Sequence, residues 1–156
     1  MTDIIRSERT AAAGFSLVEL AVTIAIASVL TTIAVPGYLQ QIREARRMEA
    51  RIALYDLVTR EERFLSTNGT YTAIPSNLGY SGEFPQVIGT GYYQVTVCVA
   101  TVAPCGNSSA TTGNVFLVQA TPVGSQASDT QCASFSVDST GVQSATGTSA
   151  GTCWIR

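Results

Sequence analysis

The feature that most constrains this chain is an apolar run near its N-terminus, GFSLVELAVTIAIASVLTTIAVP (residues 14–36). Between Phe15 and Val35 the only ionisable residue is Glu19. About 20 apolar residues, at a rise of 1.5 Å per residue, match the hydrocarbon thickness of a bilayer, which is about 30 Å. The run therefore predicts a membrane-spanning helix, and it leaves one carboxylate to be explained.

Beyond Pro36 the sequence predicts a second, amphipathic helical segment, because apolar residues recur at steps of three and four. Pro36 removes a backbone donor and Gly37 adds freedom, so we expect a kink or local melting at this junction. The helix should end near Ser66, at the start of a breaker cluster. Its principal apolar stripe is Tyr38, Ile42, Ala45, Met48, Ile52, Tyr55 and Val58, widened by a second line, Ala50, Leu54, Leu57 and Phe64.

The charged residues are few and concentrated in that segment. The chain has 156 residues, a net charge of −2, no His and nine basic residues, all Arg. Five acids share residues 43–63 with six Arg, a balance typical of a solvated helix face rather than a nucleic-acid stripe. Without His as a general base, and with no hydroxyl or thiol in a catalytic arrangement, we expect no enzyme activity and no cofactor. The six Arg are Arg43, Arg46, Arg47, Arg51, Arg60 and Arg63.

The C-terminal half changes from a helical period to alternation, which indicates strands. β-Branched runs lie at 92–100, 115–121, 132–137 and 142–145, and the sequence DSTG (138–141) predicts a hairpin between the last two. Residues 67–91 are rich in Gly and Pro and predict a long ordered loop. The predicted fold class is α+β, with a long N-terminal helix whose amphipathic half packs on a four-stranded antiparallel sheet.

All four cysteines, Cys98, Cys105, Cys132 and Cys153, lie in this half. An even number in a small head favours disulfides and an oxidising compartment. A zinc site is disfavoured because the chain has no CxxC pair and no His, and we expect no metal. Three pairings are possible. The pairing of sequence neighbours, Cys98 with Cys105 and Cys132 with Cys153, is favoured because it closes the smaller loops.

Gly14, Phe15, Glu19 and Pro36 stand at the spacing found in type IV pilins and pseudopilins, and the chain resembles that family. Family members have a leader ending in Gly, then an aromatic or hydrophobic residue, with Glu as the fifth residue of the mature chain. Residues 46–72, the hairpin around 138–141 and the closing Cys153-Trp154 pair resemble PilE-type minor pilins of type IVa pili. The resemblance implies the pilin fold, with Cys132–Cys153 as the family-like bridge and Cys98–Cys105 as an additional pair.

The resemblance also implies four segments: a leader (1–14), a transmembrane and filament-core helix (15–36), an amphipathic helix half (37–66) and a globular head (67–156). Prepilin peptidase is expected to cut between Gly14 and Phe15 and to methylate the Phe15 amine, although Ala13 replaces a basic residue common before the Gly. A carboxylate at membrane depth costs about 2.5–3.5 kcal/mol. Glu19 is therefore expected to pair with the Phe15 amine of a neighbouring subunit and to set the axial register.

The expected function is that of a minor pilin, which enters or primes a surface filament used in attachment, motility or DNA uptake. Expected partners are other pilin subunits, prepilin peptidase and the inner-membrane assembly machinery, with nucleic acid engaged only through the assembled pilus. The subunit should wait in the inner membrane with its head in the periplasm and then join the pilus. More Arg residues follow the apolar run than precede it, and by the positive-inside rule this would place the head in the cytoplasm. That orientation conflicts with the leader and the cysteines, which indicate a periplasmic head.

Four alternatives stay open. In the first, the chain is a major type IV pilin, and in the second it is a type II secretion pseudopilin, which has the same N-terminal signature. In the third, it is a secreted binding module that signal peptidase cuts between Ala27 and Ser28. In the fourth, the Arg-bearing helix binds DNA directly. The continuation of the apolar run to Val35 argues against the cut after Ala27, since such a mature N-terminus would be apolar.

Overall fold

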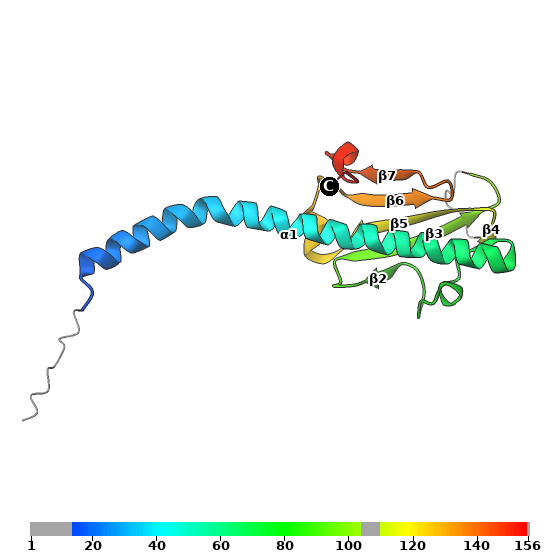
Figure 1. Ribbon diagram of the computed structural model, residues 1–156, viewed down its shortest axis with the longest axis horizontal. Coiled ribbons are helices and arrows are strands. Elements are labelled where there is room, and N and C mark those ends of the chain that lie inside the picture. Colours follow the sequence, from blue (N-terminus) through cyan, green and yellow to red (C-terminus); the bar gives the residue numbers. More distant parts are fainter. Residues whose placement is uncertain (1–13, 104–109, 156) are drawn as a thin grey trace, which may run out of the picture. The chain divides into compact units, whose positions relative to one another are not determined.

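The computed structural model describes residues 14–103 and 110–155. One long helix, α1 (Leu17–Asn68), precedes a series of short strands and 3-10 turns. The chain divides into two compact units, of which one ends at Leu39 and the other begins at Gln40. The second unit contains the C-terminal half of α1 and the whole head (Figure 1).

The head is built on a five-stranded antiparallel sheet in the order β2-β3-β5-β6-β7. The predicted strand count of four is wrong by one. The four predicted runs are β3, β5, β6 and β7, and the fifth strand, β2, comes from the predicted loop, where three residues are too short to show a period. The bounds are β2 (Gln86–Ile88), β3 (Tyr93–Ala100), β5 (Val115–Pro122), β6 (Ser134–Asp138) and β7 (Gln143–Thr146).

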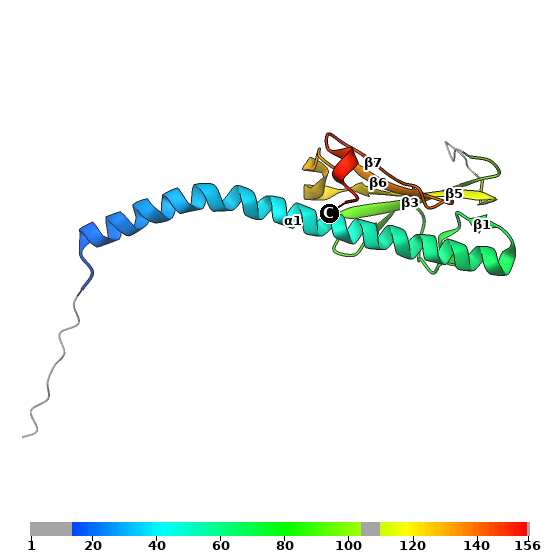
Figure 2. The ribbon, with the colours of Figure 1, turned by 45° about the horizontal axis from the view of Figure 1, so that its top comes forward.

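The rest of the predicted loop is also structured. β1 (Tyr71–Thr72) pairs with β4 (Thr112–Gly113) in a separate two-stranded ribbon, and η1 (Pro75–Leu78) follows β1. Two further 3-10 turns are η2 (Gly124–Ser128), between β5 and β6, and η3 (Ala150–Thr152), which lies beside β7 (Figure 2). The end of α1, the loop and the sheet are therefore fixed to one another by short elements.

The predicted hairpin at 138–141 is confirmed. β6 pairs with β7 in the register Val137 to Gln143, and the Asp138 carboxylate accepts hydrogen bonds from the backbone N–H groups of Thr140 (2.9 Å) and Val142 (3.0 Å). Gly141 has a φ of +80°, which a glycine adopts without strain. The sequence signal worked here because the turn is held by its own residues.

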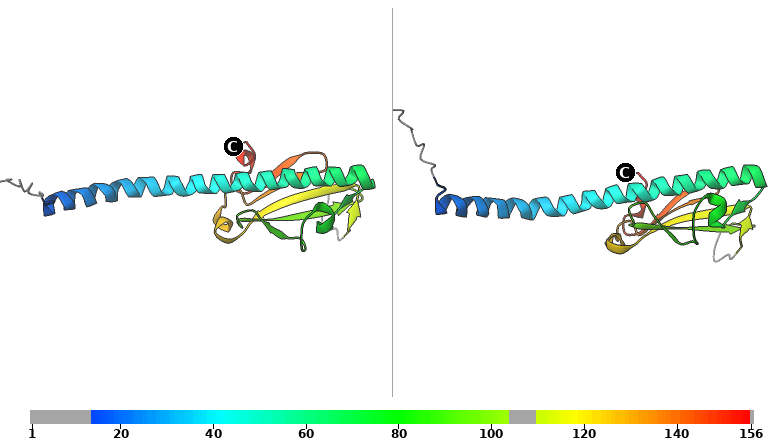
Figure 3. Two further views of the ribbon diagram at one scale, coloured as in Figure 1. Left: turned by 60° about the horizontal axis from the view of Figure 1, so that its bottom comes forward. Right: turned by 90° about the horizontal axis from the view of Figure 1, so that it is seen from below.

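The C-terminal half of α1 covers one face of the sheet (Figure 3). Ala50, Leu54 and Leu57 have no exposed surface and belong to the same buried cluster as Val95 and Phe135. Burial of each such aliphatic side chain contributes about 1.5–3 kcal/mol, which stabilises the helix on the sheet. The prediction that this half of the helix covers the sheet is confirmed.

The predicted principal stripe, however, does not face the sheet. Met48, Ile52 and Tyr55 are 47%, 63% and 47% exposed, whereas most of the second line is buried. Both lines have helical spacing, so periodicity alone does not say which one meets the sheet. As a consequence, Arg47 and Arg51, which flank Ala50, are buried rather than solvated as predicted.

In the first unit, every described side chain is exposed. The apolar part of α1 is long and apolar enough to cross a membrane, by length and composition. The helix runs unbroken through Pro36, so the local melting considered at Pro36 and Gly37 is absent, and the kink stays a prediction. It ends at Asn68, close to the predicted Ser66.

Candidate functional site

The residues predicted for processing and assembly lie at the start of α1. Gly14 precedes the helix, and Phe15 is 84% exposed. Glu19 lies in the first helical turn and makes no hydrogen bond or ion pair with any described residue. Its carboxylate is thus available to a group on another chain, as the register hypothesis requires, although pairing with a neighbouring Phe15 amine stays a prediction.

The hydroxyl groups of the apolar segment are satisfied within the helix. Thr23, Ser28 and Thr31 donate to the backbone carbonyl groups of Leu20, Ile24 and Ala27 at 2.7–2.8 Å. A hydroxyl without a partner is costly in an apolar environment. The segment therefore presents an almost fully apolar surface, suited to lipid or to other apolar helices.

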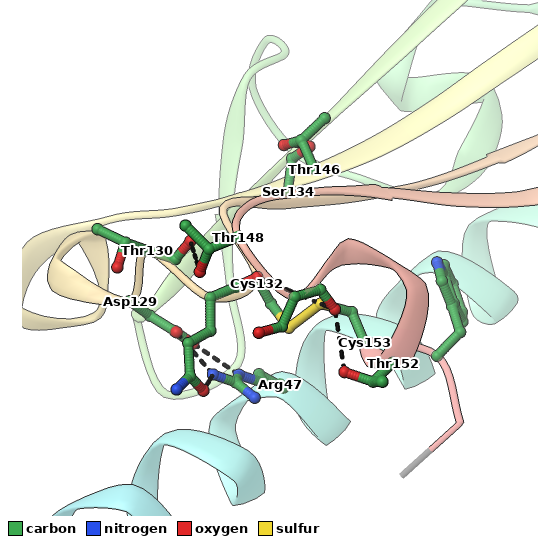
Figure 4. Close-up of a disulfide and its surroundings, with 12 residues drawn as sticks. Arg47, Asp129, Thr130, Cys132, Ser134, Thr146, Thr148, Thr152 and Cys153 are labelled. Carbon is green, nitrogen blue, oxygen red and sulfur yellow. Dashed lines mark hydrogen bonds and ion pairs between the residues drawn. A yellow bond between two sulfur atoms is a disulfide. The ribbon is translucent and has the colours of Figure 1, made fainter.

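A buried ion pair joins α1 to the loop before β6. The Arg47 guanidinium donates to both oxygens of the Asp129 carboxylate at 2.6 Å, and also to Gln131 at 3.0 Å (Figure 4). Arg47 is 9% exposed and Asp129 is 2% exposed. Burial alone would raise the pKa of the Asp129 carboxyl, but the hydrogen bonds and charge of Arg47 lower it below its ordinary value.

Gln126, in η2, also binds the Asp129 carboxylate of this ion pair. Its fully buried amide donates to the Asp129 carboxylate (3.1 Å) and the Tyr93 hydroxyl (3.3 Å), and it accepts from Arg46 (3.4 Å). The Arg46 guanidinium also lies 3.5 Å from the centroid of the Tyr92 ring. Sequence reasoning missed these contacts. The available signal was Asp129, an isolated acid close to Cys132 in a segment otherwise rich in Ser and Thr.

Two further charged residues of α1 hold the loop of residues 67–91. Glu49 accepts hydrogen bonds from the backbone N–H (2.5 Å) and the hydroxyl (2.6 Å) of Thr90, next to β2. Arg60 donates to Asp56 and to the carbonyl of Leu78 in η1, each at 2.7 Å. Charges predicted to be solvated therefore position the loop.

Glu61 is fully buried and lies next to β1, one of the two strands of the ribbon formed by β1 and β4. One carboxyl oxygen accepts from the Thr72 backbone N–H (3.1 Å), and the other has no partner among the described residues. Burial raises the pKa of Glu61 to about 7, which outweighs the opposing effect of the Thr72 hydrogen bond.

The disulfide between Cys132 and Cys153 fixes the C-terminal tail and confirms that predicted pair. It seats Trp154 between Tyr55 and Phe135, with ring centroids 5.9 and 5.7 Å apart in edge-to-face geometry. Cys98 lies on β3, but Cys105 lies outside the described residues, so their pairing stays a prediction. Among residues 14–103 and 110–155 no group of acids, Cys or His could hold a metal ion.

Comparison with known proteins gives two family matches. The model "Type IV minor pilin ComP, DNA uptake sequence receptor" matches residues 36–136, and the model "Prokaryotic N-terminal methylation motif" matches residues 9–35. The type IV major pilin protein PilA of Myxococcus xanthus is 30% identical over 70 residues, which are 45% of this chain and 32% of PilA, so the match spans well under half of that relative. A type IV pilin structure from Shewanella oneidensis aligns with a TM-score of 0.43 and 24% identity, covering 65% of this chain and 89% of that one.

Proposed function

Because the chain belongs to the type IV minor pilin family of ComP, a family of structural subunits that associate with other pilins in a pilus, we propose that it is cut between Gly14 and Phe15 and assembled as a minor subunit. One observation carries the proposal: the methylation motif at 9–35 leads directly into the minor pilin match at 36–136, and a single helix crosses that boundary. The chain acts by assembly and carries out no catalysis.

The proposed path begins in the inner membrane. Residues 1–14 are the leader that prepilin peptidase removes, residues 15–36 span the bilayer, and residues 37–66 and 67–156 form the amphipathic helix half and the head in the periplasm. The Cys132–Cys153 disulfide supports a periplasmic head, since disulfides persist in oxidising compartments. The exposure of Gly14 and Phe15 supports access by the peptidase, which then methylates the Phe15 amine.

Assembly then moves the apolar segment from lipid into a core of pilin helices with the help of the assembly machinery. Burial among other apolar helices keeps this segment away from water. Glu19 pairs with the Phe15 amine of an adjacent subunit, which neutralises both charges and sets the axial position. Pro36 and Gly37 lie where the segment meets the amphipathic half, and a kink there lets the segment adapt to its neighbours.

Direct DNA binding is the second candidate, because the matching family is described as a DNA uptake sequence receptor. The charges of this chain support it weakly. No Lys or Arg occurs between residues 64 and 155, Arg47 and Arg51 are buried, and Arg60 is paired with Asp56. Since phosphate contacts dominate protein–DNA affinity, DNA is better assigned to the assembled pilus than to this head alone.

The test is to shear surface filaments from cells that express the chain and to analyse them by quantitative mass spectrometry. We expect a trace component whose N-terminal peptide starts at a methylated Phe15. Glu19→Ala should lower incorporation, whereas Glu83→Gln, at an exposed head position, should not. An N-terminus at Ser28 would indicate a secreted module, high abundance a major pilin, and absence from filaments with loss of protein export a pseudopilin.

A further inference from the structure

Arg51 is a buried guanidinium without a carboxylate partner among the described residues. It is 8% exposed, and its hydrogen bonds to the carbonyl groups of Arg47 (3.5 Å) and Trp154 (3.4 Å) are long. They use Nε and Nη1, while Nη2 donates to no acceptor in the described part of the chain. Arg47, one turn away, has its charge matched by Asp129 at 2.6 Å. Among the described residues, the buried side-chain atoms without a partner do not include Nη2 of Arg51, so this edge of the guanidinium faces the open space beside α1 and has no carboxylate next to it.

Burial and the nearby charge of Arg47 both act against the charged form of Arg51 and lower its pKa below the ordinary value. The guanidinium nevertheless stays protonated at neutral pH, because arginine is always charged in proteins. A carboxylate close to Nη2 would therefore gain a charge-assisted hydrogen bond and would favour the charged form of Arg51.

Arg51 lines a cavity of about 230 Å³ at the start of the second unit. One wall comes from α1, with Glu44, Arg47 and Arg51, and the opposite wall from the tail and the loop before β6, with Gln131 and Thr152. A cavity of this volume can admit one carboxylate side chain. Arg47 and Arg51 set against Glu44 leave the lining with a net charge of +1, which suits a single carboxylate and not a polyanion such as a nucleic-acid backbone.

We propose that this pocket binds the carboxylate of an Asp or Glu side chain on a neighbouring pilin subunit. A guanidinium offers two parallel N–H groups that match a carboxylate, which gives both affinity and orientation. Subunits of a filament present such side chains at fixed positions and high effective concentration, so a single contact is enough. The neighbour's identity rests on the proposed function, whereas the carboxylate specificity of the pocket does not.

The first arm of the test uses the full chain in detergent micelles, with acetate as the probe. Replacing sodium chloride by sodium acetate at equal ionic strength should raise the melting temperature, read from the fluorescence of Trp154, by about 2–4 °C. Arg51→Gln should abolish the response, and Arg43→Gln, at an exposed position, should preserve it. No response in the wild type, or an equal response in Arg51→Gln, would overturn the proposal.

A second pair of variants keeps Arg51 in place. Thr152 is exposed and lines the pocket from η3, so Thr152→Glu can supply a carboxylate from the chain itself. This variant should melt at a higher temperature than the matched control Thr152→Gln and should no longer respond to acetate. If both variants respond to acetate as the wild type does, the pocket is not the site of the effect.

The final arm distinguishes a neighbouring subunit from a free anion. In sheared filaments, Thr152→Glu should be at least about fivefold less abundant than Thr152→Gln, because its pocket is already filled and the contact with the neighbour is lost. Equal abundance together with a positive acetate response would overturn the assignment to a neighbour. Absence of the wild-type chain from filaments would instead contradict the proposed function and leave the acetate result standing.

Discussion

Glu61 makes the stability of the head depend on pH, because the folded chain holds its proton to a pKa of about 7, well above the ordinary value of 4.5. Between these two values the folded state binds more protons than the unfolded state, so stability falls as the pH rises and levels off above 7. Each pKa unit corresponds to about 1.4 kcal/mol, which places the total effect on the order of 3 kcal/mol. Glu61→Gln cannot lose a proton and should escape this loss.

The check is urea unfolding of the full chain in micelles, followed by Trp154 fluorescence at several pH values. The stability advantage of Glu61→Gln over the wild type should grow from pH 4.5 to pH 7 and then stay constant. Glu83→Gln, which changes an exposed carboxyl, should show no such trend. A pH-independent difference for Glu61→Gln would contradict a proton held by the folded chain.

The Arg47–Asp129 pair leads to a different prediction, because each group compensates the other. Asp129→Asn leaves Arg47 buried without its counter-charge and should destabilise the head by about 3–5 kcal/mol. Arg47→Met combined with Asp129→Leu removes both charges and should cost less than Asp129→Asn alone. A double-mutant cycle with Arg47→Met and Asp129→Leu as its single variants measures the coupling, and a coupling energy near zero would show that the pair does not act as a unit.

These residues also show where sequence reasoning stops. Arg47, Arg51 and Glu61 were predicted to be solvated because they alternate with opposite charges on one helix. Their surroundings come from residues such as Asp129, which lies 82 positions away from Arg47. A local charge pattern carries no information about such a partner. By contrast, Asp138 was placed correctly in a turn because its partners, Thr140 and Val142, are its neighbours in sequence.

At the scale of elements, the Cys132–Cys153 disulfide decides how the tail is held. The two cysteines are 21 residues apart, and closing a loop of that length stabilises the folded state by about 3 kcal/mol in the chain-entropy model. Replacing both with Ala should lower the free energy of unfolding by a similar amount. It should also expose Trp154, which packs on Tyr55 and Phe135.

The measurement combines urea unfolding with the emission maximum of Trp154 in the folded state, which should move to longer wavelength. Tyr55→Leu serves as a control that loosens one ring contact of Trp154 and keeps the disulfide. An unchanged emission maximum in the double Ala variant would mean that packing alone, without the disulfide, seats the tail.

Long helices and strands could be predicted from the sequence, whereas the shortest strands could not. The long helix and four of the five sheet strands were predicted, because each has enough residues to show a period. β1, β2 and β4 have two or three residues each and were missed. The buried face of α1 was only partly predicted, since two adjacent apolar lines both have helical spacing and periodicity does not choose between them. Ile52 and Met48 are exposed because they belong to the line that does not face the sheet.

At the scale of the whole molecule, the N-terminal signature was the most informative feature of the sequence. Gly14, Phe15 and Glu19 have defined spacings in one short stretch of sequence at the start of α1, so they can be recognised without knowledge of the head. Contacts between α1 and the head, in contrast, join segments far apart in sequence. The candidate assembly residues were therefore named from sequence, whereas the pocket around Arg51 became visible only in the folded chain.

The distribution of charge over the whole molecule predicts how the chain meets DNA. The described head surface beyond residue 63 has no cation, so exposed positive charge comes mainly from Arg43 and Arg63, with partial contributions from Arg46 and Arg60. Each phosphate contact contributes a slope of about 0.9 to the fall of log affinity with log salt. For the full chain in micelles we expect duplex binding that is weak, with a slope of about 4 or less.

Arg63→Gln should reduce that slope by about 1, because it removes one available phosphate contact. Arg47→Met should leave the slope unchanged, since Arg47 is buried and already paired with Asp129. Fluorescence anisotropy of a labelled duplex over a range of salt concentrations gives both values. A slope well above 4 would require cations that the described surface does not provide, and it would shift the assignment from the assembled pilus to direct recognition of DNA by this subunit.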